Sequence, residues 1–295
     1  MHFKEVKGIL SAKNGMNMFR GCTHGCIYCD SRSTCYQINH EFTDIEVKIN
    51  APMLLEQKLI SKRKKCMIGT GAMTDPYVHE EINLKLTRSL LEIIEKYKFG
   101  LAIQTKSNRI LRDLDLLKQI NHNAKCVVQM TLTTYDESLC KIIEPFVSTT
   151  KERFETLKIM RDEGIPTVVW LGPILPFIND TKENIEGILK YIVDAKVKGV
   201  IWFGTGLTLR EGNREYYYQK LDEHFPGLKE TYIKKYGNQY LAYSENHEMI
   251  DKIVHETCEK HGIMHNIDQV FSYLNTYEIK SPFEQISLFD WSLQR

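Results

Sequence analysis

The sequence predicts an α/β fold, a partial (β/α)6 barrel with a helical C-terminal extension. Short apolar runs recur along the chain up to residue 208, and amphipathic helical patterns separate them. After that residue the pattern changes to helix alone. Strands that alternate with helices pair in parallel. With 295 residues, 42% of them apolar, the chain is long enough to bury a large core.

Six apolar runs are predicted to be strands because each is short and ends at turn residues or at a helical pattern. They cover residues 16–21, 66–71, 100–105, 125–134, 165–174 and 199–206. No seventh or eighth unit is evident, which indicates an open barrel rather than a closed one. A doubly wound sheet has the same alternation, so this pattern alone does not separate the two.

Four segments between these runs are predicted helices. Between residues 82 and 97, apolar side chains return every three or four positions and share one face. The other three helices cover residues 111–120, 152–161 and 181–195. Asp180 is the expected N-cap of the last helix, with Glu183 three residues further on.

The chain contains no linker, internal repeat or low-complexity tract that would divide it. We expect residues 1–210 to form the barrel core and residues 211–280 to form a helical cap of the same domain. Residues 281–295 are expected to be a tail.

Charge and hydropathy restrict the class of protein. The chain has 39 Lys and Arg against 38 Asp and Glu, a formal net charge of +1. This balance gives no signature of non-specific nucleic-acid binding, so any DNA contact is expected to be local. No apolar run approaches the roughly 20 residues of a membrane span, and the first residues lack the apolar core of a secretory signal. These features predict a cytoplasmic protein without a membrane segment.

Four of the eight cysteines lie between residues 22 and 35. In a reducing compartment they are expected to be free thiols or ligands rather than disulfides. Cys22, Cys26 and Cys29 follow the first predicted strand, and chemistry in parallel β/α folds gathers at the carboxyl ends of strands. Three thiolates can hold three irons of a 4Fe-4S cube and leave the fourth iron open to a small molecule.

A zinc site is the alternative interpretation of these cysteines. Cys35, His24 or His40 would then complete a four-ligand set. Zinc sites favour two cysteine clips, and the sequence has only one, so the pattern favours the cluster.

The motif C-x-x-x-C-x-aromatic-C, with Tyr28 as its aromatic residue, resembles the signature of radical S-adenosylmethionine (SAM) enzymes. Further blocks are similar to the spore photoproduct lyase-like group of that superfamily, often labelled DNA repair photolyases. They read RGCTHGCIYCDSRS, MTDPYVHEE, TKSNRILRDLDLL, TLTTYDESLCKIIEP, GPILPFIND and TLREGNREYYYQKLDEHFPGLKETYIKKYG.

The resemblance implies a partial barrel of the radical SAM type, a 4Fe-4S cluster, and SAM that chelates the open iron. One electron then splits SAM into methionine and a 5'-deoxyadenosyl radical, which abstracts a hydrogen atom from the substrate. The group name implies DNA lesion repair, and a flavodoxin or ferredoxin is the implied electron donor. Modification of a peptide or small metabolite is the alternative function, and a non-catalytic iron-sulfur or zinc module is the third.

The resemblance also implies roles for residues at the ends of predicted strands. Tyr28 would lie against the adenine of SAM. Lys106 ends a buried strand, where an uncompensated ammonium is costly, and would bind the SAM carboxylate. The other cofactor candidates are Ser107, Thr131 and Thr133, whose hydroxyls suit ribose contacts, and Thr74 and Asp75, which suit ribose or substrate. Ordinary strand and turn chemistry is the alternative for these five.

Three positions concern the substrate. Arg210 follows the sixth predicted strand and is expected to bind a phosphate or carboxylate of the substrate, a surface position being the alternative. Spore photoproduct lyase returns a hydrogen atom through a cysteine near the end of its second strand, where this chain has Ala72 and Met73. This chain also has Asp30 directly after its last cluster cysteine, where the lyase has a tyrosine. We therefore do not expect the same hydrogen relay.

The tail carries a separate motif, QISLF, with Gln285, Leu288 and Phe289. It resembles the peptide by which bacterial repair and replication proteins bind the sliding clamp. Such short motifs also arise by chance, and a tail that packs on the barrel is the alternative.

Overall fold

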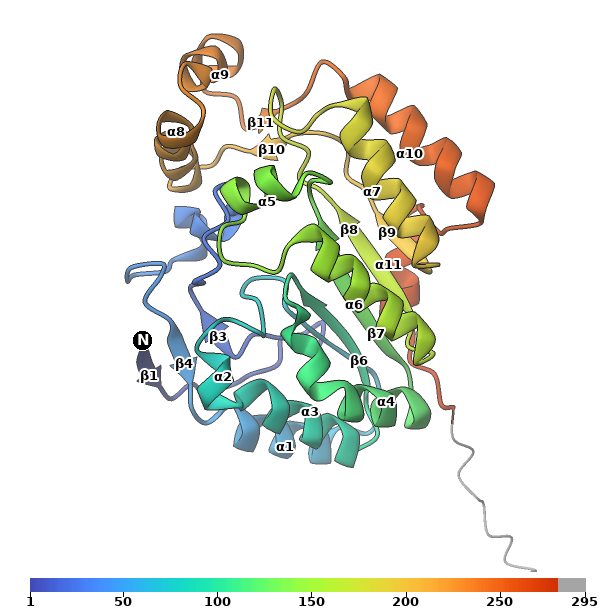
Figure 1. Cartoon of the computed structure of the whole chain (residues 1–295). Helices are drawn as coiled ribbons and strands as arrows, with labels where there is room; N and C mark the ends of the chain where they lie inside the picture. Colours follow the sequence, from blue (N-terminus) through green and yellow to red (C-terminus); the bar gives the residue numbers. More distant parts are fainter. Residues whose placement is uncertain (281–295) are drawn as a thin grey trace, which may run out of the picture.

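The centre of the molecule is a six-stranded parallel sheet, seen here in a computed structural model that describes residues 1–280. The strand order is β2-β5-β6-β7-β8-β9, and every neighbouring pair is parallel. The strands are β2 (Gly15–Met16), β5 (Met67–Thr70), β6 (Gly100–Thr105), β7 (Cys126–Leu132), β8 (Thr167–Leu171) and β9 (Gly199–Ile201). Within residues 1–280, β2 and β9 do not pair, so the sheet is open (Figure 1). The predicted α/β fold is confirmed.

Eleven α-helices and three 3-10 turns accompany the described strands. The helices are α1 (Ala51–Ser61), α2 (Glu81–Leu84), α3 (Leu86–Lys96), α4 (Leu114–Asn123), α5 (Glu137–Ile143), α6 (Thr150–Asp162), α7 (Lys182–Asp194), α8 (Asn213–His224), α9 (Leu228–Tyr236), α10 (His247–His261) and α11 (Ile267–Asn275). The turns are η1 (Asp30–Arg32), η2 (Thr34–Tyr36) and η3 (Asn108–Asp113). None of the described helices combines the length and apolarity that a bilayer crossing requires.

The first predicted strand, residues 16–21, is divided between two sheets. Met16 belongs to β2 and pairs with Thr70 of β5. β3 (Phe19–Arg20) instead pairs antiparallel with β4 (Glu46–Lys48), which also pairs in parallel with β1 (His2–Lys4). A small sheet in the order β1-β4-β3 therefore adjoins the start of the cysteine segment (Figure 1).

Several helix boundaries differ from the sequence prediction, among them those of the segment 111–120, where α4 begins only after η3, and two differences have a clear cause. The segment 82–97 is broken at Lys85, which has a φ of 51°, and the Glu81 carboxylate accepts hydrogen bonds from the first two N–H groups of α3 at 3.0 Å. The N-cap of α7 is Thr181, whose hydroxyl accepts from the Asn184 N–H at 3.2 Å, and not Asp180. Asp180 accepts a hydrogen bond from Ser244 instead.

The sheet has two different faces because successive side chains of a strand point to opposite sides. On β7, Val128 and Met130 pack in the clusters formed with the outer helices. Val127 points to the inner face, where Val270 and Leu274 of α11 pack against it. The apolar inner face is thus covered by α11 near the amino ends of the strands, which leaves their carboxyl ends free for a cavity.

The C-terminal segment is helical, as predicted, and its helices pack in three places. α8 and α9 pack through Tyr217 and Tyr232 against the cysteine segment. α10 packs against α7 and extends the outer helical layer, and α11 covers the inner face. A short antiparallel pair, β10 (Leu207–Thr208) and β11 (Leu241–Ala242), joins the barrel to these helices. The predicted boundaries between the barrel core, the helical cap and the tail, at residues 210 and 280, stay predictions.

Gln285, Leu288 and Phe289 of the predicted clamp-binding motif lie outside the described residues. That motif therefore remains a prediction from the sequence.

Candidate active site at the carboxyl ends of the strands

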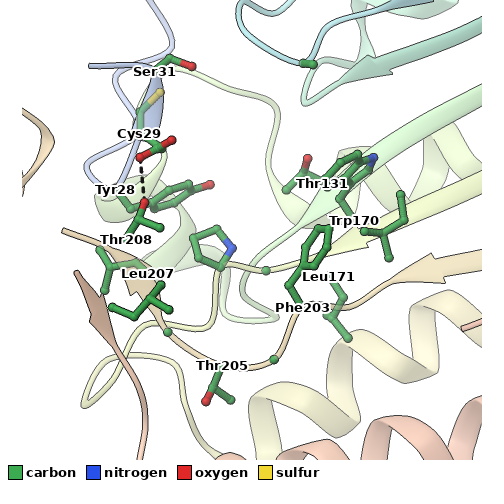
Figure 2. A pocket seen from close by; sticks show the side chains of 18 of the residues that line it. Tyr28, Cys29, Ser31, Thr131, Trp170, Leu171, Phe203, Thr205, Leu207 and Thr208 are labelled. Atoms are coloured by element: carbon green, nitrogen blue, oxygen red, sulfur yellow. Dashed lines mark hydrogen bonds between the residues drawn. The ribbon is translucent and has the colours of Figure 1, made fainter. Parts of the chain in front are cut away.

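A cavity of about 560 Å³ opens at the carboxyl ends of the central strands. Its volume lies within the range of roughly 300–1,000 Å³ typical of small-molecule sites. Figure 2 shows Tyr28 and Cys29 on one side of this cavity and Trp170 and Phe203 on the other. Tyr28 and Cys29 follow β3, Trp170 lies near the end of β8, and Phe203 follows β9, as expected for parallel β/α folds.

The cysteine loop is folded tightly beneath this cavity. Gly21 and Gly25 have φ values of 83° and 70°, and a Cβ on Gly21 would lie 2.5 Å from the Phe42 carbonyl oxygen. Both glycines are therefore required by the loop conformation. Cys22 and Cys26 are buried, whereas Cys29 is partly exposed and lines the cavity.

The three thiols fit a cluster better than a single ion. The sulfur atoms of Cys22, Cys26 and Cys29 do not all lie within 4.8 Å of one another. Among the described residues, the group of three possible metal ligands that does meet this distance is His2, His40 and Asp44. A tetrahedral zinc with Zn–S bonds of about 2.3 Å needs sulfurs about 3.8 Å apart. The wider spacing of the three thiols therefore favours the cluster over a single zinc ion.

The surroundings of the thiols also suit ligation by iron. Burial, together with the neighbouring Cys29, raises the pKa of Cys22 to about 12, and backbone N–H groups of His24 and Asp75 that hydrogen-bond to its sulfur oppose this. Burial also raises the pKa of Cys26, against the opposing charge of Lys106. Buried thiols of this kind ionise when a metal supplies the compensating charge, and N–H donors stabilise ligating sulfurs.

Lys106 carries a positive charge into the same cavity. It directly follows β6, and its Nζ lies 5.8 Å from the centre of the Tyr28 ring. Burial opposes this charge, but Cys26 and Glu144 outweigh burial, so the pKa of Lys106 is raised. In residues 1–280 no carboxylate lies within salt-bridge distance of Nζ, so the ammonium is available to an anionic ligand.

A buried ion pair holds Tyr28 in place. Glu144, at the end of α5, and Arg153, on α6, are both fully buried and hydrogen-bond to each other. Glu144 also accepts from the Tyr28 hydroxyl and, at 3.2 Å, from Thr133. Arg153 donates to the Thr131 carbonyl at 2.7 Å. The pair thereby fixes the aromatic residue of the cysteine motif against the end of β7.

Asp30 and Arg210 form a second polar network at the edge of the cavity. Asp30 accepts from Thr208 at 2.7 Å, drawn as the dashed line in Figure 2, and from the Tyr36 hydroxyl at 2.8 Å. Arg210 lies 3.2 Å from the Asp30 carboxylate and also donates to Tyr240 at 2.8 Å. Its guanidinium is thus engaged by the protein, and its predicted role in substrate binding stays a prediction.

The remaining predicted cofactor residues occupy different environments. Thr131 lines the cavity, and its buried hydroxyl has no hydrogen-bond partner among the described residues. Thr133 belongs to the Glu144 network. Ser107 caps η3 by accepting from the Arg109 N–H at 3.2 Å. These three assignments to SAM stay predictions.

Thr74 and Asp75 lie outside the active-site cavity. Thr74 lines an adjoining cavity instead. Asp75 is buried and accepts from the Thr105 hydroxyl and the Lys106 N–H, each at 2.7 Å. Asp75 therefore orients the backbone from which Lys106 projects.

Four residues of the site do not follow from the motif. Arg153 shares a helical face with the apolar Leu157 and Met160, and a charge on an apolar face is the signal that could have found it. Trp170 lies two residues after Val168 and therefore on the same inner face of β8, so strand alternation is the signal that could have placed it at the site. Glu144 and Phe203 lie in loops and have no such signal.

The fold and the site define a parallel α/β protein with three clustered thiols at the carboxyl edge of its sheet. The model of the radical SAM superfamily matches residues 16–192, more than half of the chain. The chain therefore belongs to the radical SAM superfamily. Proteins of this superfamily use a 4Fe-4S cluster and SAM, which are accordingly the cofactors of this chain.

Two curated relatives illustrate the sequence similarity. An uncharacterized protein of Methanocaldococcus jannaschii is 34% identical over 176 residues, 59% of this chain and 65% of that protein. An uncharacterized protein of Mycobacterium tuberculosis is 28% identical over 234 residues, 75% of this chain and 66% of that protein. The chain thus spans about two thirds of the length of these relatives.

Solved structures of spore photoproduct lyase have the same fold. One mutant superposes with a TM-score of 0.61 at 15% identity, covering 88% of this chain and 77% of the lyase. Another, with bound AdoMet and dinucleoside spore photoproduct, gives 0.58 at 16% identity, covering 83% and 72%. At this identity the likeness shows the fold alone.

Replacing Arg153 with Met is expected to destabilise the protein by roughly 3–5 kcal/mol at neutral pH, because Glu144 becomes an unpaired buried charge. Burial raises the pKa of Glu144, but the charges of Arg153 and Lys106 outweigh burial, so its pKa lies below the usual glutamate value. The ion pair therefore stabilises the folded protein at pH values above that usual value, and this contribution is lost as the pH falls and Glu144 is protonated. The deficit of Arg153→Met should therefore shrink in acid. Urea denaturation at several pH values measures it.

Adding Glu144→Gln to Arg153→Met removes both charges and should recover most of the lost stability. A double variant as unstable as the single one would show that lost packing, and not the unpaired carboxylate, causes the effect.

Proposed function

We propose that this chain cleaves SAM reductively and abstracts a hydrogen atom from a nucleotide of DNA, as a step in lesion repair. The observation that carries this proposal is a single cavity. It joins a cluster cysteine, a lysine without a carboxylate partner and exposed aromatic side chains.

The chain's own residues have separate roles in this proposal. When bound, the cluster and SAM supply the electron transfer and the 5'-deoxyadenosyl radical. Cys22, Cys26 and Cys29 hold the cluster. The Lys106 ammonium binds the carboxylate of SAM, since a charged hydrogen bond stabilises an otherwise unpaired cation. Tyr28, fixed by Glu144, supports the adenine.

Hydroxyl groups complete the proposed SAM site. The unpartnered hydroxyl of Thr131 is suited to a ribose hydroxyl, because a buried polar group without a partner costs roughly 1–3 kcal/mol. Asp75, Ser107 and Thr133 act in this proposal by positioning Lys106 and Tyr28.

Exposed aromatic rings favour a nucleobase as the substrate. Phe203 is 62% exposed and Tyr243 is 51% exposed, although both line the cavity. The Trp170 and Phe203 rings lie 6.1 Å apart. Aromatic side chains stack on bases with about 1–3 kcal/mol per base, and stacking is the usual means of holding unpaired nucleotides. We define Trp170, Phe203 and Tyr243 as the aromatic wall.

The cluster assignment is tested by replacing Cys22, Cys26 and Cys29 with Ala together. After anaerobic reconstitution with iron and sulfide, the variant should lack both the brown colour and the formation of 5'-deoxyadenosine from SAM and dithionite. Cys66→Ala, which changes a cysteine far along the chain, is the matched control. SAM cleavage that survives in the triple variant refutes the proposed function.

The role of Lys106 is tested by Lys106→Met, which keeps most of the side-chain volume and removes the charge. SAM affinity should fall about 10- to 100-fold, the equivalent of a charged hydrogen bond of roughly 1.5–3 kcal/mol. Equilibrium dialysis of SAM against the reconstituted protein measures this loss. Lys64→Met, at an exposed position, should bind SAM normally.

The nucleic-acid substrate is tested by Phe203→Ala. Binding of single-stranded oligothymidylate should weaken by about 5- to 150-fold if one base stacks on this ring. Fluorescence anisotropy measures the affinity, and Ile60→Ala serves as the control because Ile60 is similarly exposed, at 64%, but lies on α1. Equal affinities in both variants would favour the alternative, a peptide or small-metabolite substrate.

A further inference from the structure

A second cavity, of about 340 Å³, adjoins the active-site cavity. Tyr36 and Met73 line both cavities, so the two meet at the mouth of the barrel. Of the residues predicted to bind the cofactors, Thr74 alone lines the second one. The small sheet β1-β4-β3, which Figure 1 shows beside the cysteine segment, contributes Lys4, Phe19, Arg20, Glu46 and Lys48 to its lining.

Most of the charged side chains that line this second cavity are positive. Lys4, Arg20 and Lys48 line it, and Glu46 is the one carboxylate among its lining residues. Glu46 already pairs with Lys4, whose Nζ lies 2.9 Å from the carboxylate. Two positive charges are therefore left over.

Arg20 and Lys48 contact only neutral oxygens among the described residues. Arg20 donates to the backbone carbonyls of Tyr36 and Gln37 at 2.8 and 3.2 Å. Lys48 donates to the Asn17 carbonyl at 2.6 Å. Both side chains keep further donors that an anion can use.

The register of the small sheet concentrates this charge on one face. Lys4 lies directly opposite Lys48 in the β1–β4 pair, and Arg20 lies opposite Glu46 in the β3–β4 pair. Like charges at opposite positions destabilise a sheet. Burial lowers the pKa of Lys48, and the charges of Arg20 and Lys4 add to this against Glu46. Glu46 offsets one of the three positive charges, and the excess that remains favours a bound anion.

Asn17 provides an independent observation. Its buried Oδ1 has no hydrogen-bond partner among the described residues, and the side chain lines the second cavity. Rotation of the amide by 180° exchanges Oδ1 for the Nδ2 donor. An anion in the cavity would satisfy that donor.

We infer that the second cavity binds a phosphodiester group of the nucleic-acid strand whose base lies against the aromatic wall. This inference rests on the proposed function, because it concerns the same substrate. A phosphodiester offers oxygen acceptors and a negative charge to one guanidinium and one ammonium, a favoured pairing in proteins. The shared residues Tyr36 and Met73 separate the base site from the phosphate site.

Binding of fluorescein-labelled oligothymidylate to the reconstituted full chain with SAM tests this inference. Lys48→Gln and Arg20→Gln should each weaken binding about tenfold, the effect of losing one charged hydrogen bond. Each should also reduce the slope of log K against log salt by about 0.7. Lys64→Gln, an exposed lysine after α1, should bind like the original chain.

Two further ligands identify the source of the phosphate. An oligothymidylate with a neutral methylphosphonate backbone should bind the original chain at least as weakly as Lys48→Gln binds the normal strand, because it loses the charge contacts of both Arg20 and Lys48. Inorganic phosphate should compete only weakly. Strong competition by inorganic phosphate would show a site for free phosphate and would overturn the phosphodiester assignment.

Unfolding would not explain the expected loss of oligothymidylate affinity. Lys48→Gln removes a repulsion with Lys4, so this variant should have a melting temperature at or above that of the original chain. Equal affinities of Lys48→Gln, Arg20→Gln and Lys64→Gln overturn the inference, while a remaining effect of Phe203→Ala leaves the proposed function intact. If the original chain forms 5'-deoxyadenosine but binds no oligothymidylate, the nucleic-acid part of the proposed function fails, and this inference fails with it.

Discussion

The buried ion pair between Glu144 and Arg153 joins the elements from which the active site is built. Removing two charges from water costs several kcal/mol per ion, so such a pair persists only when its remaining donors and acceptors are also used. Glu144 accepts from Tyr28 and Thr133, and Arg153 donates to the Thr131 carbonyl. These partners belong to the cysteine loop and to the end of β7. The position of the thiols relative to the sheet therefore depends on one charged centre.

The inner face of the sheet explains why the site lies where it does. Strand alternation sends every second side chain inward, and on the central strands β6 and β7 these side chains change from apolar to polar along the strand. On β7 the inward residues are Val127, then Gln129, then Thr131. α11 covers the apolar part, and the polar part faces the cavity. A helix far along the chain thus completes the barrel and leaves one end of it open to ligands.

The sequence predicted the parallel alternation and the cysteine site, because both depend on local patterns that a strand or a ligand set requires. It did not predict that residues 16–21 divide between two sheets, since partners as distant as Glu46 and Thr70 decide that. Nor could it assign the N-cap of α7, because Asp180 and Thr181 are both good caps and only the contact with Ser244 separates them. The Glu144–Arg153 pair joins two helices whose packing no local pattern specifies.

The two cavities bear on how a substrate radical regains a hydrogen atom. A thiol in that role must line the cavity that holds the substrate, yet among the described residues lining either cavity the one cysteine is Cys29, a cluster ligand. Met73 stands between the cavities and carries no S–H group. Asp30 is held by Thr208, Tyr36 and Arg210, so it acts here as the centre of a hydrogen-bond network. The expectation that this chain does not use the hydrogen relay of spore photoproduct lyase, which rests on Ala72, Met73 and Asp30, therefore stays a prediction.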